Sequence, residues 1–194
     1  MKRVIKLIVI AFFYILMIPF GLSAKLAHKL FGSQILFSMF AEFLSLIPSF
    51  PGYFSRGCFY QMTLAKADVE LFVAFGSYIS KIDTKIGKGV GIGGRTIIGL
   101  CEIGDNTVIA NNVSILSGSK QHNFDDPTKL ITDTENKFDK MFIGESVFIG
   151  DQTVIMANIG DKSIIGAGSI VVKDIPPYSI AVGNPAKVVK ERAK

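Results

Sequence analysis

The amino-acid sequence predicts an all-β solenoid, a parallel β-helix, joined to an apolar helical segment at its amino-terminal side. Two observations support this fold class. β-Branched residues recur at six-residue intervals between Ile86 and Val171, and most of the 16 Phe residues precede Phe75. The composition therefore divides the chain into a hydrophobic helical part, residues 1–65, and a solenoid part, residues 66–194.

The six-residue period is the most specific feature of the sequence. Eight of the eleven intervals between successive anchor residues are six residues long, and every anchor is Ile or Val. Neither the period of a helix nor the alternation of a single strand produces this spacing, whereas a solenoid of short strands does. We expect each unit to turn its aliphatic residue inward and a neighbouring small residue into a corner. The anchors are Ile86, Ile92, Ile98, Ile103, Ile109, Ile115, Ile143, Ile149, Ile155, Ile159, Ile165 and Val171.

The ends of the solenoid can also be predicted. It is expected to begin near Val69, because the period extends backwards to Val73. The run Asp174-Ile175-Pro176-Pro177 is expected to end it, since proline cannot donate to a continuing strand ladder. Beyond this run, Asn184-Pro185 matches the cap and first residue of a helix, which predicts a short C-terminal helix over residues 184–194.

The amino-terminal segment has the length and composition of a membrane-associating helix. Residues 4–22 contain a single charge, Lys6, and as a helix they would measure about 28 Å, close to the hydrocarbon thickness of a bilayer. A second apolar run, residues 34–47, is too short to cross comfortably. A cleavable signal peptide is one interpretation, disfavoured by the bulky Leu22 near the cleavage position. A simple span is another, disfavoured by the charges of Met1-Lys2-Arg3 under the positive-inside tendency.

A third interpretation agrees with both charge and length. Residues 4–47 would form a monotopic anchor at the membrane surface, with both ends in the cytosol. The protein would then sit on the cytoplasmic face of the inner membrane, monotopic or peripheral. The remaining alternative is that these helices only cover hydrophobic surface on the rest of the protein.

The repeat unit, Ile or Val followed by Gly and four variable residues, resembles that of the hexapeptide-repeat acyltransferases over about residues 69–190. The runs Ile165-Gly166-Ala167-Gly168-Ser169 and Val182-Gly183-Asn184-Pro185-Ala186-Lys187 are similar to those of galactoside, maltose and xenobiotic acetyltransferases. The resemblance implies a left-handed coil, a homotrimer, and acetyl-CoA bound as co-substrate in the groove between neighbouring subunits. By position, it implies that backbone contacts and charges for this cofactor come from Ala167, Gly168, Lys173 and Lys187.

One long excursion, residues 118–141, interrupts the period and contains the only histidine of the repeat region, His122. Long loops that leave a rigid solenoid are typical of functional elements. Transfer of an acetyl group from a thioester to an alcohol needs a base, and histidine titrates near neutrality, so it can take the hydroxyl proton and return it to the departing thiolate. In the resembled family the catalytic histidine lies in this loop, so we expect His122 to be the base.

Other polar residues are candidates to orient the imidazole or to bind the acceptor. They are Asn112, Asp125, Asp126 and Glu145. Asp126, which precedes Pro127, could equally cap a turn. Asn112 could equally be a corner residue that tolerates left-handed geometry.

Several classes of function are disfavoured by composition. His28 and His122 are too few for the three-histidine zinc site of a γ-type carbonic anhydrase, so no metal is expected. Cys58 and Cys101 form no C-x-x-C motif. No Walker or G-x-G-x-x-G element precedes a predicted helix, so neither a nucleotide triphosphate nor NAD is expected. The chain shows no interleaved basic and aromatic pattern, so nucleic acid is not expected either.

The sequence therefore predicts an acetyl-CoA-dependent O-acetyltransferase that modifies a hydroxyl of a sugar or glycan precursor. The apolar segment favours a lipid-linked acceptor, as in capsule, exopolysaccharide or O-antigen biosynthesis. A xenobiotic (antibiotic) O-acetyltransferase is the alternative, although a soluble drug gives no reason for that segment. A purely structural scaffold would have no need for the loop that carries His122.

Overall fold

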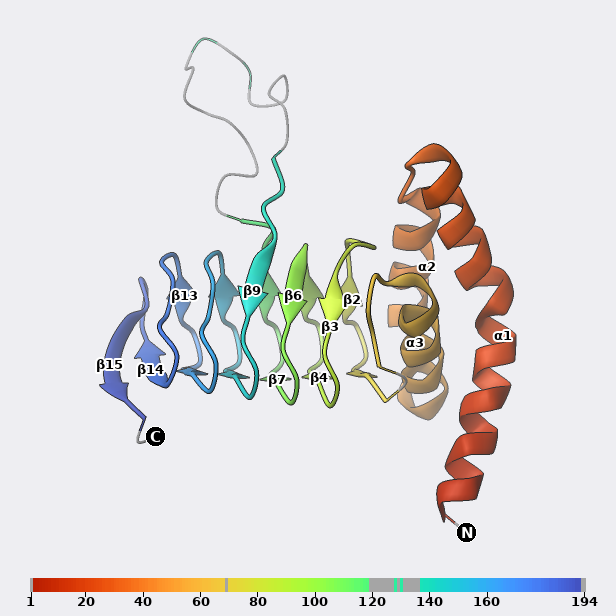
Figure 1. Ribbon diagram of the computed structural model, residues 1–194, viewed down its shortest axis with the longest axis horizontal. Helices are drawn as coiled ribbons and strands as arrows, with labels where there is room; N and C mark the ends of the chain where they lie inside the picture. The colour runs from red at the N-terminus through yellow and green to blue at the C-terminus, as the bar shows by residue number, and fades with distance from the viewer. Residues whose placement is uncertain (1, 69, 119–127, 129, 131–136, 193–194) are drawn as a thin grey trace.

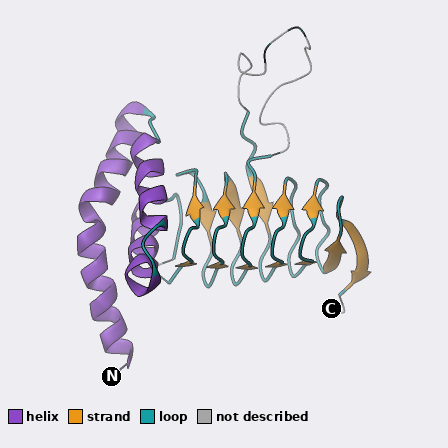
Figure 2. Ribbon diagram, turned by 180° about the vertical axis from the view of Figure 1, so that it is seen from behind, coloured by secondary structure: helices purple, strands orange, loops and turns teal. Residues whose placement is uncertain are grey.

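Three helices cover one end of a three-sided coil of short strands in the computed structural model (Figures 1 and 2). The structure describes residues 2–68, 70–118, 128, 130 and 137–192. The chain is thus mostly β, with helices at its amino-terminal side. The helices are α1 (Lys2–Phe31), α2 (Ile35–Ser45) and α3 (Ser49–Thr63).

The sides of the coil are three sheets, which we name by their numbers of strands. The seven-stranded sheet contains β1 (Phe72–Val73), β4 (Gly91–Ile92), β7 (Val108–Ile109), β10 (Phe148–Ile149), β12 (Ile164–Ile165), β14 (Ser179–Val182) and β15 (Lys187–Glu191). The five-stranded sheet contains β2 (Tyr78–Ile79), β5 (Ile97–Ile98), β8 (Ser114–Ile115), β11 (Val154–Ile155) and β13 (Ile170–Val171). The three-stranded sheet contains β3 (Lys85–Ile86), β6 (Cys101–Ile103) and β9 (Met141–Ile143).

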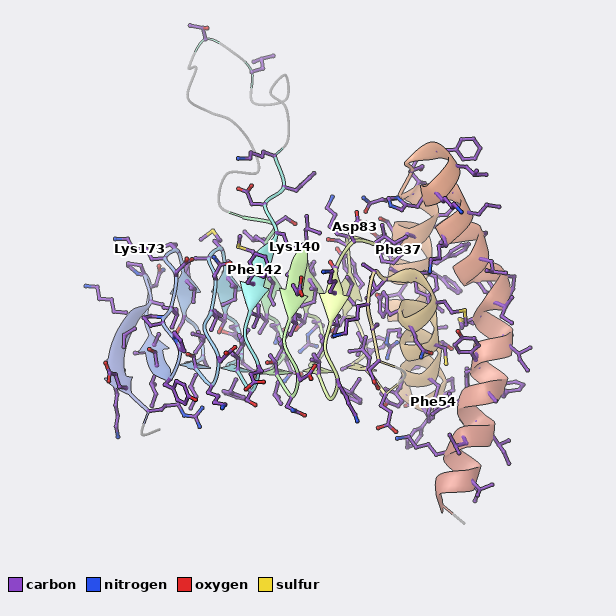
Figure 3. The ribbon with its side chains drawn as sticks, in the orientation of Figure 1. Phe37, Phe54, Asp83, Lys140, Phe142 and Lys173 are labelled. Atoms are coloured by element: carbon purple, nitrogen blue, oxygen red, sulfur yellow. The ribbon has the colours of Figure 1, made fainter. Side chains whose placement is uncertain are left out.

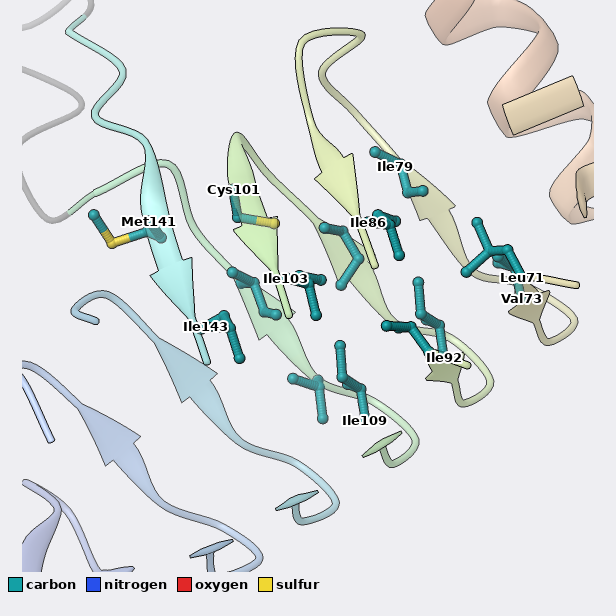
Figure 4. Packing of buried hydrophobic residues seen from close by; sticks show 14 of the residues in the cluster. Leu71, Val73, Ile79, Ile86, Ile92, Cys101, Ile103, Ile109, Met141 and Ile143 are labelled. Carbon is teal, nitrogen blue, oxygen red and sulfur yellow. The ribbon is translucent and has the colours of Figure 1, made fainter. Parts of the chain in front are cut away.

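The predicted inward register of the repeat is confirmed. Each strand pairs in parallel with its equivalent one coil away, so Ile92 lies beside Ile109 and Ile109 beside Ile149. These side chains are buried, and Figure 4 shows how they fill the inside of the coil. Stacking identical positions buries a continuous aliphatic column without any long-range pattern in the sequence.

Two of the three corners of the coil are regular, and each contains a column of residues with positive φ. At the corner between the seven- and five-stranded sheets these are Gly76, Arg95, Asn112, Gln152 and Gly168. At the corner between the three- and seven-stranded sheets they are Gly89, Asn106, Ser146, Lys162 and Tyr178. A left-handed residue lets the chain turn sharply between two-residue strands.

The third corner, between the five- and three-stranded sheets, is irregular. We call it the loop corner; it comprises residues 80–84, 99–100, 116–140, 156–158 and 172–174. The departures from the six-residue period at Ile98–Ile103 and Ile155–Ile159 both fall here, as does the long insertion between β8 and β9. Figure 1 shows β9, to which the insertion returns, and its preceding residues at this edge of the coil. The solenoid therefore tolerates changes of length at one corner only.

The helices complete the hydrogen bonds of the first coil. In later coils the left-handed corner residue donates its N–H to the preceding coil, as Asn112 does to the Gly94 carbonyl. The first coil has no predecessor, and Gly76 N donates instead to the Ser45 carbonyl at the end of α2, over 2.8 Å. In edge strand β2, the N–H of Ile79 donates to the buried Tyr60 hydroxyl of α3, over 3.0 Å.

Arg56 of α3 has the central place in this cap. Its Nε donates to the carbonyl of Val73 in edge strand β1, over 2.9 Å, and its Nη1 donates to the carbonyls of Leu44 and Ile47 at the end of α2. The side chain is buried, and burial lowers the pKa of the guanidinium below its ordinary value. One side chain thus donates to two carbonyls at the end of α2 and to one carbonyl of an edge strand.

The predicted division at residue 65 falls inside one hydrophobic core. Phe37 and Phe59 stack at 5.8 Å between ring centroids, and they belong to the same buried cluster as Leu71 and Val73 of the first coil. Helix α3 gives little signal in the sequence, because Pro51 and two glycines interrupt its pattern. The expected start at Val69 lies outside the described residues.

The predicted C-terminal helix over residues 184–194 is wrong. Residues Lys187–Glu191 form β15, which pairs antiparallel with β14. The Asn184-Pro185 signal for a helix start is overridden because β14 is otherwise the open edge of its sheet, and a returning strand supplies its missing partners. The β-branched residues Val188 and Val189 suit this extended conformation.

The prolines that were expected to end the coil end only one of its sheets. Ile175 still bridges to Ile159, and β14 continues the seven-stranded sheet beyond Pro177. In the preceding coil Gly160 donates its N–H to the Ile175 carbonyl. Pro176 is the next residue in that column and has no further coil to donate to, so its missing N–H costs nothing there.

Replacement of Arg56 tests the helix cap. Arg56→Met removes the donor to three carbonyls, and we expect the free energy of unfolding to fall by about 2–4 kcal/mol. Burying carbonyls without this donor costs more free energy than is gained when the buried charge is removed. Urea unfolding at fixed protein concentration in one detergent measures it. The matched control is Arg95→Met, an exposed arginine that bonds Asn112, for which about 0.5 kcal/mol or less is expected. Equal losses in the two variants would contradict the role of Arg56.

Candidate active site

The roots of the long loop lie side by side at the loop corner. Asp139 donates its N–H to the Ser117 carbonyl over 2.9 Å, and Met141 N donates to the Leu100 carbonyl over 3.0 Å. Gly118 has φ of 89°, and a Cβ there would lie 3.0 Å from that of Asp139, so the outgoing chain must pass this close to the returning one. The loop therefore starts and ends at a fixed position on a rigid coil.

The segment that leads from the loop into β9 contacts the first coil. The Lys81 ammonium lies 3.7 Å from the centroid of the Phe138 ring, a cation–π contact that links the loop root to residues next to the helices. Asp83, two residues on, lies 3.7 Å from Nε2 of His28 on α1. In Figure 3 Asp83, Lys140 and Lys173 follow the same edge of the coil from which the loop rises.

The predicted catalytic residues of the loop fall outside the described part of the chain. These are His122, Asp125 and Asp126. Asn112 is described, and it occupies the left-handed corner between the seven- and five-stranded sheets, with φ of 55°. Its Oδ1 accepts a hydrogen bond from Arg95 Nε over 2.9 Å. This is the corner geometry that the sequence left open, and within one chain the corner is separated from the loop corner by the whole five-stranded sheet.

Glu145 lies at the other regular corner, between the three- and seven-stranded sheets. Its carboxylate is 3.6 Å from the Lys162 ammonium, and its N–H donates to Asp161 Oδ1 over 2.9 Å. Within a single chain, therefore, Asn112 and Glu145 stand at different corners, and neither is at the loop corner.

The predicted cofactor residues divide between two corners and the last strand. Ala167 and Gly168 are exposed at the same corner as Asn112, and a Cβ on Gly168 would meet no atom within 4 Å. Lys173 is exposed at the loop corner, two coils beyond the loop root. Lys187 is exposed in β15, where the sequence had predicted a helix.

A shallow hollow of about 500 Å³ lies over the three-stranded sheet and its corner. Its lining includes the carboxylates of Glu102, Asp105, Glu145 and Asp161, with the exposed ring of Phe142. Each carboxylate already has a partner within the described chain: two accept backbone N–H groups and two pair with lysines. Its acidic lining is unsuited to the phosphates of a nucleotide cofactor.

The two cysteines are structural. Burial raises the pKa of Cys58 to about 11 and that of Cys101 to about 12, so both thiols stay protonated at neutral pH. Among the residues that the structure describes, three or more His, Cys, Asp or Glu side chains nowhere gather closely enough to hold a metal ion.

Comparison with known families matches the two halves of the repeat. A family model described as "Hexapeptide repeat of succinyl-transferase" matches residues 83–117 and 141–173, and the gap between the matches coincides with the long loop. Galactoside O-acetyltransferase of Escherichia coli is 44% identical over 92 residues, which are 46% of this chain and 43% of that protein. Serine acetyltransferase 3 of Arabidopsis thaliana is 42% identical over 109 residues, 54% of this chain and 25% of that one. The chain thus matches less than half the length of these relatives.

Solved structures extend the similarity to the fold. A maltose O-acetyltransferase from Clostridium difficile superposes with a TM-score of 0.69 and 27% identity, over 81% of this chain and 87% of that one. A galactoside acetyltransferase in complex with coenzyme A superposes with a TM-score of 0.64 and 27% identity, over 81% and 80%. These neighbours support the left-handed coil that the repeat implied. Residues 83–117 and 141–173 are therefore hexapeptide repeats, in a coil that superposes on those of these acetyltransferases.

Proposed function

We propose that this protein is an acetyl-CoA-dependent O-acetyltransferase that modifies a hydroxyl of a sugar or glycan precursor. The observation that carries the proposal is the coincidence of two features. A hexapeptide-repeat family model matches on both sides of residues 118–140, and the chain is similar to a galactoside O-acetyltransferase. The insertion between the two matches contains a histidine, and its described roots are hydrogen-bonded to the coil.

His122 is the proposed general base. It takes the proton of the acceptor hydroxyl while the oxygen attacks the thioester carbonyl, the carbon–sulfur bond breaks, and the proton passes to the departing sulfur. The products are an acetyl ester and free coenzyme A. Histidine suits both transfers because its ordinary pKa lies near neutrality. The roles of Asn112, Asp125, Asp126 and Glu145 in orienting the base or the acceptor remain part of the proposal.

Acetyl-CoA is the proposed co-substrate, supported by the related galactoside acetyltransferase that was solved with coenzyme A. Ala167 and Gly168 offer exposed backbone without bulky side chains, and Lys173 and Lys187 offer charges for phosphates. These residues and the loop roots stand at different corners of one chain, and the proposed site that uses all of them forms between neighbouring copies.

A homotrimer is the proposed assembly, and the outer face of the seven-stranded sheet supports it. From β1 to β14 one outward position of this sheet holds apolar residues or glycine, in register from strand to strand, and in β15 Lys190 follows. The outward face of the three-stranded sheet is polar by contrast, with the pair of Lys85 and Glu102. An exposed apolar column of this length indicates an interaction surface. The column consists of Phe72, Gly91, Val108, Phe148, Ile164 and Ile180.

The proposed acceptor is lipid-linked, and the proposed location is the cytoplasmic face of the inner membrane, with residues 4–47 at the membrane surface. The support is the helix of residues 4–31, which is long and apolar enough to meet a bilayer and has little of its surface buried in the protein. An enzyme that acts on a soluble antibiotic, the alternative acceptor, would have no need of this apolar helix.

Substitution of His122 tests the chemistry. His122→Ala is expected to lower the rate of acetyl transfer to a soluble sugar at least about a hundredfold, since a general base contributes about 10² to 10⁴. Acetyl-CoA binding by calorimetry and the oligomeric state should stay unchanged, because the loop leaves the packed coil. The matched control is His28→Asn, the other histidine of the chain, with activity near that of the parent. Near-normal turnover of His122→Ala at neutral pH would remove His122 from the mechanism.

A charge in the apolar column tests the assembly. Phe148→Glu is expected to yield a folded monomer, with the dissociation constant raised at least about a hundredfold, because the carboxylate would be desolvated without a partner in the interface. Sedimentation equilibrium in one detergent measures the mass. The control is Phe142→Glu, on the polar three-stranded sheet, where the parent ring is comparably exposed (54% against 45%). A trimeric Phe148→Glu, or a monomeric control, would contradict this choice of interface.

A further inference from the structure

Helix α1 has its polar side toward the protein and its apolar side outward. Lys6 pairs with Glu70 over 2.6 Å, Lys25 donates to the Met62 carbonyl over 3.1 Å, and His28 lies beside Asp83. The stripe that packs on α3 is small or apolar and includes Met17, Gly21 and Ala24. The opposite side carries a row of aliphatic residues, each more than half exposed: Val4, Ile8, Ile15, Leu22 and Leu26. A helix at a water-facing surface has the reverse arrangement.

Helix α2 extends the same apolar surface. Its buried residues Phe37, Ala41 and Leu44 face α3 and the first coil, and α2 is next to β2. The opposite side carries exposed Ile35, Met39, Phe43 and Leu46. Phe20 of α1 and Phe40 of α2 meet edge to face at 5.2 Å, so the two helices are neighbours. We call the combined exposed stripes of α1 and α2 the outer face; it is turned away from the coil.

The geometry of α1 is incompatible with a simple membrane span. Figures 1 and 2 show α1 lying across the end of the coil, roughly perpendicular to its length. Its contacts with Glu70 and Asp83 are made by residues 6 and 28, about 33 Å apart along the helix, which is close to the whole hydrocarbon thickness. A bilayer crossed along this axis would place the coil between these contacts, with ion pairs such as Lys85–Glu102, inside hydrocarbon.

We propose that the outer face lies flat on a lipid bilayer, with α1 in the plane of the interface and the length of the coil directed away from the membrane. This inference rests on the membrane association in the proposed function and specifies its geometry. Apolar side chains would enter the boundary between headgroups and acyl chains, as in other in-plane helices. The polar coil stays in water throughout.

Charge favours a bilayer with anionic headgroups over a second copy of the chain. Residues 2–63 contain a single acidic residue, Glu42, against six Lys and Arg. Lys29 is exposed near the end of α1, on the same side as Leu22 and Leu26, where anionic headgroups would attract it. Pairing of two outer faces would instead bring like charges together.

Vesicle flotation tests the surface. Full-length protein is mixed with vesicles of phosphatidylethanolamine and phosphatidylglycerol, and the detergent is removed. We expect the parent to float and the double variant Ile15→Glu, Leu22→Glu to lose at least about tenfold in bound fraction, since charges at the outer face cannot enter the apolar boundary. The control is Val189→Glu, an equally exposed apolar residue in β15 at the far end of the coil, which should float like the parent. Undiminished flotation of the double variant would overturn the proposal, as would a parent that doubles its mass and does not float.

Depth measurement distinguishes a flat helix from a crossing one. Single cysteines at Ile8→Cys, Ile15→Cys and Leu26→Cys are labelled with bimane and quenched by lipids that carry nitroxides at known depths. Cys58 and Cys101 are buried, and the unlabelled parent gives the background. A flat helix places all three probes at one shallow depth, about 5–10 Å below the headgroups. A probe near the bilayer centre at Ile15→Cys, with the other two near opposite surfaces, would overturn the proposal.

Acetyl transfer to a soluble sugar, measured on the same flotation variant, separates this inference from the proposed enzyme activity. Turnover on the soluble acceptor that survives while flotation is lost supports an anchor distinct from the active site. If the variant unfolds like the parent but loses both flotation and turnover of the soluble acceptor, the anchor and the active site are not separate. Absence of transfer by the parent would contradict the enzyme assignment and leave the flotation result to decide the anchor.

Discussion

A stack of parallel strands has to end somewhere, and the helices of this protein are the way its first coil ends. Every strand in the stack uses its neighbours on both sides for its backbone hydrogen bonds, so a first coil exposed to water would present open edges on all three sheets. Here α2 and α3 provide the missing partners, through Arg56, Tyr60 and the carbonyl of Ser45. The third sheet is completed by Lys66, whose carbonyl accepts from Ile86. At the other end of the stack, β15 pairs with β14 and covers the edge of the seven-stranded sheet.

This cap explains why the helical layer has two different faces. Its inner face must match the edge of a coil, which requires a buried guanidinium, a buried hydroxyl and an aromatic core. Its outer face is free of that constraint and is nonetheless apolar, which water alone would not favour. The two faces therefore have separate physical causes, one in folding and one in the environment of the protein.

The sequence predicts the coil well because its period is local. The six-residue unit fixes the position of each inward Ile, and the unit recurs too often to be a chance pattern. Elements that depend on a distant partner are harder to predict. The strand β15 carries the Asn184-Pro185 signal of a helix, and only the open edge of β14 decides otherwise. Arg56 gives no sign in the sequence of its three carbonyl partners, because they lie on two other elements.

The same distinction applies to the candidate site. The loop and His122 stand out because they break the period, whereas the role of Asn112 could not be settled from its neighbours alone. The structure places it in a column of left-handed residues, a position that geometry alone suffices to explain. Gly168 belongs to that column, with φ of 70°, so a glycine there also has a structural reason, and Ala167 directly precedes it.

The corner arrangement links catalysis to assembly. A six-residue side separates adjacent corners by a distance on the order of 15 Å, so the loop of one chain leaves at one edge of the five-stranded sheet while the proposed cofactor backbone lies at the other. The apolar column on the seven-stranded sheet offers a surface by which copies can pack side by side. The corner with Ala167 and Gly168 borders this sheet, whereas the loop corner lies opposite it. Three coils held parallel in this way would also turn their capped ends to the same side. The long axis of the coil would then set how the copies align, which corners meet at the cofactor and which end approaches the membrane.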